Sequence, residues 1–225
     1  MMARRRQSGF TMIEALITVA VTVALGMLAF SSLWRLRPRA HLADASSELA
    51  SLVYGARQEA LATGNNVAVL VFPGYAGPNS TGRVIVYEDG DFSLFTAAAV
   101  PNFANYNPAV PPHGPNSTII STWDVPFAVT VGPATGMGAA AVLPAPFAAI
   151  PVNVDCSFCA ALAFGRAGAV VFDAHGWASF YSNVGAPIAN LTGGSLSLAA
   201  PDVNGQRTLI ITSATGSVTL WNTGG

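Results

Sequence analysis

Lysine is absent from this 225-residue sequence, and all ten of its basic residues are arginine. Charged residues of both signs make up only 9% of the chain, and the formal net charge is −1. Binding to nucleic acid depends mainly on clustered Lys and Arg that neutralise phosphates. The composition therefore gives no electrostatic reason to expect general nucleic-acid binding.

Cysteine is also scarce, since Cys156 and Cys159 are the only two and form a single C-x-x-C. In a cytosolic enzyme this spacing would indicate redox chemistry or half of a metal site, whereas in an exported domain it indicates a disulfide. A zinc site would need two more ligands, for which Asp173 and His175 are the candidates. The compartment decides between a disulfide, which the sequence favours, free thiols and a metal site.

Signatures of catalysis are missing as well. The sequence contains no Gly-x-Ser-x-Gly and no Gly-rich phosphate loop followed by Gly-Lys. Asp173, His175 and Ser179 fall within one expected hairpin, where turn chemistry accounts for Asp173 and Gly176. We therefore predict no catalytic residues, no metal, no cofactor and no enzymatic activity.

The N-terminus carries the most specific pattern. A short basic leader with Arg4–Arg6 precedes an apolar run, Phe10–Trp34, whose only ionisable side chain is Glu14. About 20 apolar residues make a helix of about 30 Å, the thickness of the hydrocarbon core of a bilayer. No small-residue signal-peptidase site follows the run, so a plain signal anchor is the simple alternative.

Glu14 argues against a plain signal anchor, because a carboxylate inside an apolar helix is costly in lipid and indicates a function. The pattern of a basic leader, Gly9, Phe10, Thr11 and Glu14 resembles the type IV prepilin signature. The resemblance implies cleavage after Gly9 by a prepilin peptidase and N-methylation of Phe10. It also implies that Glu14 pairs with the N-terminal amine of a neighbouring pilin. The chain would be a single-pass inner-membrane protein that then enters a periplasmic or extracellular filament.

The helical pattern continues beyond the membrane segment. Leu42, Leu49 and Ala56 are spaced by seven and belong to one apolar stripe, and Gly64 supplies the end of the helix. Pro38 predicts a kink or break. The expected organisation is a leader at 1–9, a membrane and filament-core helix at 10–36, an amphipathic half at 37–64 and a β-rich domain at 65–225.

The segment Leu49–Val71 resembles the link between helix and first strand in FimT/FimU-type minor pilins and in H-type pseudopilins of type II secretion. Arg57, Glu59 and Ala60 are the matching positions. This resemblance implies a pilin-like α+β fold, with a long N-terminal helix, membrane-spanning in its first half, packed on an antiparallel β-sheet domain. It leaves pilus and secretion system both open.

After residue 65 the pattern becomes strand-like, with short apolar or β-branched runs between turn residues. The order of one helix followed by antiparallel strands indicates an α+β fold. The expected strands are 67–72, 83–87, 92–95, 118–123, 127–131, 160–164, 169–172, 177–181, 208–212 and 217–221. The stretches 102–116 and 132–155 are expected to be loops, with no role assigned.

We therefore expect a structural subunit that helps to initiate or cap a type IV pilus or a type II secretion pseudopilus. The alternative is a filament-tip module that captures DNA or a surface ligand. The candidate DNA contacts are Arg83, Arg166 and Arg207, which lie far apart in the sequence, so the sequence argues against this alternative.

Overall fold

The computed structural model describes residues 11–77, 80–97, 102–111, 116–134, 143–189, 191–201, 203 and 205–223. Within them one long helix precedes ten strands and two short 3-10 turns. The elements are α1 Met12–Thr63, β1 Asn66–Phe72, β2 Ser80–Asp89, η1 Ser93–Phe95, η2 Phe103–Asn105, β3 Ser117–Pro126, β4 Thr130–Val131, β5 Ala160–Leu162, β6 Gly165–Phe172, β7 Ala178–Tyr181, β8 Gly193–Ala199, β9 Gln206–Thr212 and β10 Val218–Thr223. The expected α+β class is confirmed.

The chain divides into two compact units, with the sequence boundary between Arg37 and Pro38. In the first unit, the α1 segment Met12–Phe30 is long and apolar enough to cross a membrane, and its side chains are exposed. Its 19 residues correspond to about 29 Å of helix. Length and composition thus agree with the expected membrane segment.

Pro38 does not end α1, which runs through it to Thr63, so the expected break is wrong, and the alternative, a kink, stays a prediction. Proline removes one backbone donor and crowds the preceding turn. A single missing hydrogen bond does not end a helix when the turns on both sides keep theirs.

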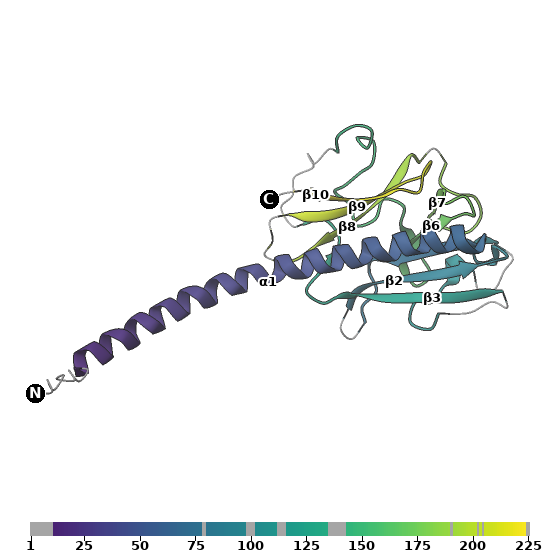
Figure 1. Ribbon diagram of the computed structural model, residues 1–225. Helices are drawn as coiled ribbons and strands as arrows, with labels where there is room; N and C mark the ends of the chain where they lie inside the picture. Colours follow the sequence, from purple (N-terminus) through teal and green to yellow (C-terminus); the bar gives the residue numbers. More distant parts are fainter. Residues whose placement is uncertain are drawn as a thin grey trace, which may run out of the picture. The chain divides into compact units, whose positions relative to one another are not determined.

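The second unit contains the expected antiparallel β-sheet domain, which consists of two sheets. Sheet A has the order β3-β2-β1-β6-β5, with β7 also paired to β6, and sheet B has the order β10-β9-β8-β4. Figure 1 shows β8, β9 and β10 on one side of the second half of α1, and β2 and β3 on the other. Buried side chains of α1 contact both sheets in one core that includes Leu42, Leu49, Val53, Val69, Val86, Phe172, Leu198 and Ile211.

The remaining faces of both sheets are covered by loop residues. A second cluster joins sheet A to Leu94, Phe95, Phe103 and Tyr106. A third joins Ile210 of sheet B to Leu143, Ile150 and Val152. Because sheet A is covered on both faces, β1 is a continuous apolar run instead of alternating. The two long loops therefore supply core residues, a role that the sequence left open.

The expected strand at 92–95, and its hairpin with 83–87, are wrong. This segment forms η1, because the buried carboxylate of Asp89 accepts hydrogen bonds from the backbone amides of Ser93 (3.1 Å) and Leu94 (2.9 Å). Phe92 takes a left-handed conformation with φ 57° just before the turn. The aromatic side chains then fill the outer face of sheet A.

Two further differences concern sheet B. The strand expected at 127–131 is reduced to β4, residues Thr130–Val131. Strand β8 was missed, because its sequence GGSLSLA has little β-branched or aromatic character. It is nevertheless buried along its whole length. A side chain at Gly194 would meet the ring of Phe180 at 2.3 Å, so tertiary packing selects small residues here.

Candidate functional site

The processing residues Gly9 and Phe10 lie outside the described residues. The described chain begins with Thr11, one residue before α1. The backbone amide and the hydroxyl of Thr11 both donate to Glu14 Oε2, at 3.0 and 2.9 Å. In return, the Glu14 amide donates to the Thr11 hydroxyl at 3.3 Å.

This reciprocal pair is a capping box, in which a Ser or Thr before the helix and a Glu three residues later satisfy the free amides of the first turn. Sequence reasoning assigned Glu14 to assembly alone and missed its capping partner Thr11. The signal was available, since Thr-x-x-Glu before an apolar run is the sequence mark of this cap. The same carboxylate therefore also orders the start of the apolar helix.

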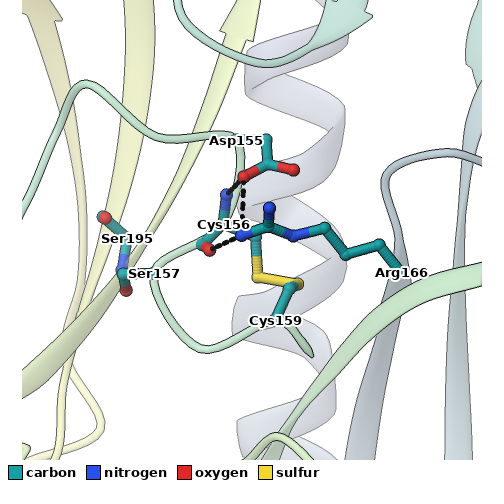
Figure 2. Close-up of a disulfide and its surroundings, with 6 residues drawn as sticks. All are labelled: Asp155, Cys156, Ser157, Cys159, Arg166 and Ser195. Carbon is teal, nitrogen blue, oxygen red and sulfur yellow. Dashed lines mark hydrogen bonds and ion pairs between the residues drawn. A yellow bond between two sulfur atoms is a disulfide. The ribbon is translucent and has the colours of Figure 1, made fainter. Parts of the chain in front are cut away.

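The two cysteines form a disulfide, as the sequence favoured over free thiols and metal (Figure 2). Their Cα atoms are 5.4 Å apart, Cys156 is buried and Cys159 is half-buried. Beside the bridge, Arg166 Nη2 contacts Asp155 Oδ1 at 3.1 Å and the Cys156 carbonyl oxygen at 3.4 Å. This ion pair is partly exposed, so it adds little to stability.

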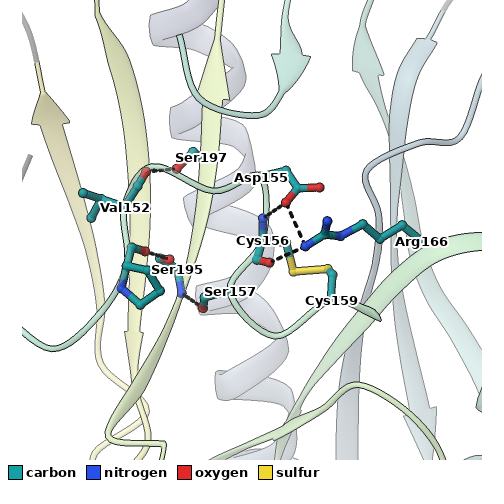
Figure 3. Close-up of polar contacts among 9 residues, drawn as sticks. Val152, Asp155, Cys156, Ser157, Cys159, Arg166, Ser195 and Ser197 are labelled. Carbon is teal, nitrogen blue, oxygen red and sulfur yellow. Dashed lines mark hydrogen bonds and ion pairs between the residues drawn. A yellow bond between two sulfur atoms is a disulfide. The ribbon is translucent and has the colours of Figure 1, made fainter. Parts of the chain in front are cut away.

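The disulfide lies where the chain passes from one sheet to the other. Inside the short loop that the disulfide closes, Ser157 donates its amide to the Ser195 carbonyl of β8 at 3.0 Å, and the Ser195 amide donates to the Ser157 hydroxyl at 2.8 Å. Just after it, β5 pairs with β6 of sheet A. Figure 3 shows this corner with Ser195 and Ser197 of β8 facing the crossing segment. The bridge therefore braces the connection between the two sheets.

The three arginines considered for DNA contact have separate partners. Arg83 forms two hydrogen bonds with Asp124, at 2.6 and 2.9 Å, and the carboxylate raises the pKa of its guanidinium. Arg207 donates to the buried hydroxyl of Ser46 at 3.2 Å, and Arg166 belongs to the disulfide corner. These contacts do not join the three into one basic patch. DNA binding stays an untested prediction.

Asp173 and His175 behave as turn residues. Asp173 Oδ1 accepts hydrogen bonds from the amides of His175 (2.8 Å) and Trp177 (3.0 Å), and closes the turn between β6 and β7. In the part of the chain that the structure describes, no group of three or more His, Cys, Asp or Glu residues is arranged to hold a metal.

Arg57, one of the positions that match the link between helix and first strand in minor pilins, contacts the turn between β6 and β7. Arg57 Nε donates to the carbonyl oxygen of Gly176 at 3.2 Å, and Ala60 is fully buried. The turn between β9 and β10 reaches this point as well. A side chain at Gly216 would lie 2.0 Å from the Gly176 oxygen and 3.0 Å from Arg57 Nε. The end of α1 thus joins the hairpin turns of both sheets.

Comparisons with known proteins bear on the N-terminal segment. The family model of the prokaryotic N-terminal methylation motif matches residues 4–30. No curated protein matches the chain. The crystal structure of the type IV minor pilin FimU from Pseudomonas aeruginosa aligns with 81% of this chain and 90% of that chain, at 13% identity and a TM-score of 0.40. Similarity at this level carries no argument on fold or function.

The motif spans the basic leader, the expected cleavage site, Glu14 and the apolar helix, so it confirms the prepilin resemblance on those residues. The helix it marks leads into the antiparallel domain described above. The N-terminal helix of this chain therefore carries a prokaryotic, prepilin-type N-terminal methylation motif.

Proposed function

We propose that this chain is a minor pilin or pseudopilin, a structural subunit that helps to initiate or cap a type IV pilus or a type II secretion pseudopilus. The observation that carries the proposal is Glu14, a carboxylate within the methylation motif and near the start of an exposed apolar helix. The role is structural and requires no catalysis. Its partners are other pilins or pseudopilins, the prepilin peptidase and the inner membrane.

Processing comes first in this proposal. Cleavage after Gly9 frees the amine of Phe10, which is then methylated. The new N-terminus lies one residue before Thr11 and four before Glu14. Before assembly, the apolar helix anchors the subunit in the inner membrane.

Assembly then brings apolar helices side by side and buries Glu14 between them. A buried charge is tolerated only when it is paired, and breaking such a pair costs about 3–5 kcal/mol. Among the described residues, both side-chain bonds to Glu14 go to Oε2. Oε1 can therefore accept the amine of a neighbouring subunit while the cap of its own helix stays formed.

The test separates the charge of Glu14 from its capping role. Glu14→Gln keeps an oxygen that can accept from Thr11, but removes the charge. Thr11→Ala removes the hydroxyl and leaves the charge. We expect both variants to be cleaved after residue 9, as read by N-terminal mass spectrometry of the membrane fraction.

Incorporation into sheared filaments is measured next, by immunoblot against the membrane pool. We expect at least a tenfold loss for Glu14→Gln and a much smaller loss for Thr11→Ala. Wild-type incorporation of Glu14→Gln would rule out the charge pairing. A chain that is never cleaved after Gly9 would rule out the filament role itself.

A further inference from the structure

A groove of about 640 Å³ lies in the second unit, between α1 and the outer strands of sheet A. Figure 1 shows α1 running alongside β2 and β3, the strands that contribute to the groove. One wall is formed by α1 and the other by Val86 of β2 and Ile120 and Ser121 of β3. No function assigned above uses this groove.

One row of residues on the helical wall of the groove is small, and it is flanked by Glu48, Leu52 and Glu59. Ser47, Ser51 and Gly55 follow one another at intervals of four, so they lie one above the other on the same face of α1. A Cβ atom at Gly55 would have no heavy atom within 4 Å. A ridge this low lets the side chains of a second helix approach closely.

The strand wall presents an apolar side chain through a β-bulge. Val86 pairs with Ser121, but the next residue, Tyr87, pairs with Ile119, so Ile120 is an extra residue in the ladder. Ile120 lines the groove and remains 43% exposed. A bulge re-aims a side chain and interrupts the edge of a sheet. This geometry favours docking of side chains over the addition of another strand.

All the charged side chains among the described residues that line the groove are acidic. Asp44, Glu48 and Glu59 line it, and no Lys or Arg lies among its described lining residues. An apolar floor beneath three carboxylates is complementary to a helix that carries Arg or Lys beside an apolar stripe. The arginines on this chain's own strands are held by Asp124, by Asp155 and by Ser46.

We propose that this groove docks a basic amphipathic helix of a different subunit of the same filament. The proposal rests on the proposed function, since it names the partner chemistry of that subunit. The apolar stripe of the partner contacts Ile120 and Leu52, and its cationic groups meet Glu48 and Glu59. Docking in this groove determines which subunit of the filament lies beside this chain.

The probe is a synthetic, fluorescently labelled helical peptide with a Leu stripe flanked by Arg. A second peptide has Glu in place of Arg, and a third has Ser in place of Leu. Binding to the full chain in non-ionic detergent is followed by fluorescence anisotropy. We expect the Leu–Arg peptide to bind at least tenfold more tightly than either control.

Matched variants locate the binding. Gly55→Leu fills the groove at a position with free space and raises helix propensity, so folding is retained. Gln58→Leu makes a similar change on an exposed face of α1 outside the groove. E48Q/E59Q removes two groove charges, and E88Q/D91N removes two charges elsewhere.

We expect Gly55→Leu to weaken binding at least tenfold and E48Q/E59Q to weaken it about fivefold at low salt, the latter effect fading at high salt. Gln58→Leu and E88Q/D91N should bind as wild type. Equal binding by Gly55→Leu would overturn the proposal. Self-association of the chain that Gly55→Leu abolishes would assign the groove to a second copy, and would also overturn it. Loss of incorporation in Glu14→Gln with normal incorporation of Gly55→Leu would leave the filament role intact and refute only the groove.

Discussion

The junction at the end of α1 gives a sharp test of how the second unit is held together. Gly216 lies in the turn between β9 and β10, with a positive φ of 58°. A Cβ atom at this position would lie 2.0 Å from the carbonyl oxygen of Gly176, the atom that accepts the hydrogen bond of Arg57. Replacing Gly216 with Ala should therefore disturb the contact between α1 and both hairpin turns.

Gly216→Ala lowers the stability of the folded chain in two ways, and the two costs add. The left-handed conformation costs a residue with a Cβ atom about 1–2 kcal/mol. The clash is with backbone, so the turn must shift, at a further cost of about 1–3 kcal/mol by analogy with overpacking. We expect the free energy of unfolding to fall by about 3 kcal/mol, and the melting temperature by about 6–12 °C for a unit of this size.

Gly64→Ala is the matched control. Gly64 also has a positive φ, 72°, but a Cβ atom there would meet nothing within 4 Å. The loss of stability in Gly64→Ala should reflect the backbone conformation alone, about 1–2 kcal/mol. The difference between the two variants therefore isolates the steric contact at the junction.

Thermal unfolding of the full chain in non-ionic detergent measures both variants, followed by tryptophan fluorescence, to which the buried Trp123 contributes. A Gly216→Ala variant no less stable than Gly64→Ala would refute the close approach of the two turns.

Two more predictions concern stability. Cys156 and Cys159 close a short loop, for which the chain-entropy model gives about 2 kcal/mol. C156S/C159S should lose about that much in urea unfolding and become insensitive to dithiothreitol, and a wild-type midpoint in this variant would contradict the bracing role. Burial raises the pKa of Asp89 above its usual 3.8, so in the range just above that value the folded chain binds this proton more tightly than the unfolded chain. Its contribution to the free energy of unfolding therefore falls as pH rises through that range. Asp89→Asn should flatten this part of the pH dependence, measured as urea midpoints between about pH 4 and pH 6. An unchanged slope would refute the assignment.

The sequence by itself determined the N-terminal features. The leader, Gly9, Phe10 and Glu14 form a local pattern whose meaning depends on neighbours along the chain, and the family model matches the same residues. The apolar stripe of α1 and most strands were likewise predictable, because helix and strand periods are local properties. The disulfide followed from Cys spacing once the N-terminus had indicated export.

The tertiary structure decided what depends on distant contacts. It made β8 a strand despite its weak propensity, because Gly194 faces the ring of Phe180 and only a small residue fits. It turned 92–95 into a 3-10 turn, because the buried carboxylate of Asp89 caps that turn and a second cluster needs its aromatic rings. It also joined Arg57, Gly176 and Gly216, which are far apart in the sequence, at one junction. Such pairings leave no periodic trace in a sequence, because the energy that selects them comes from packing between elements.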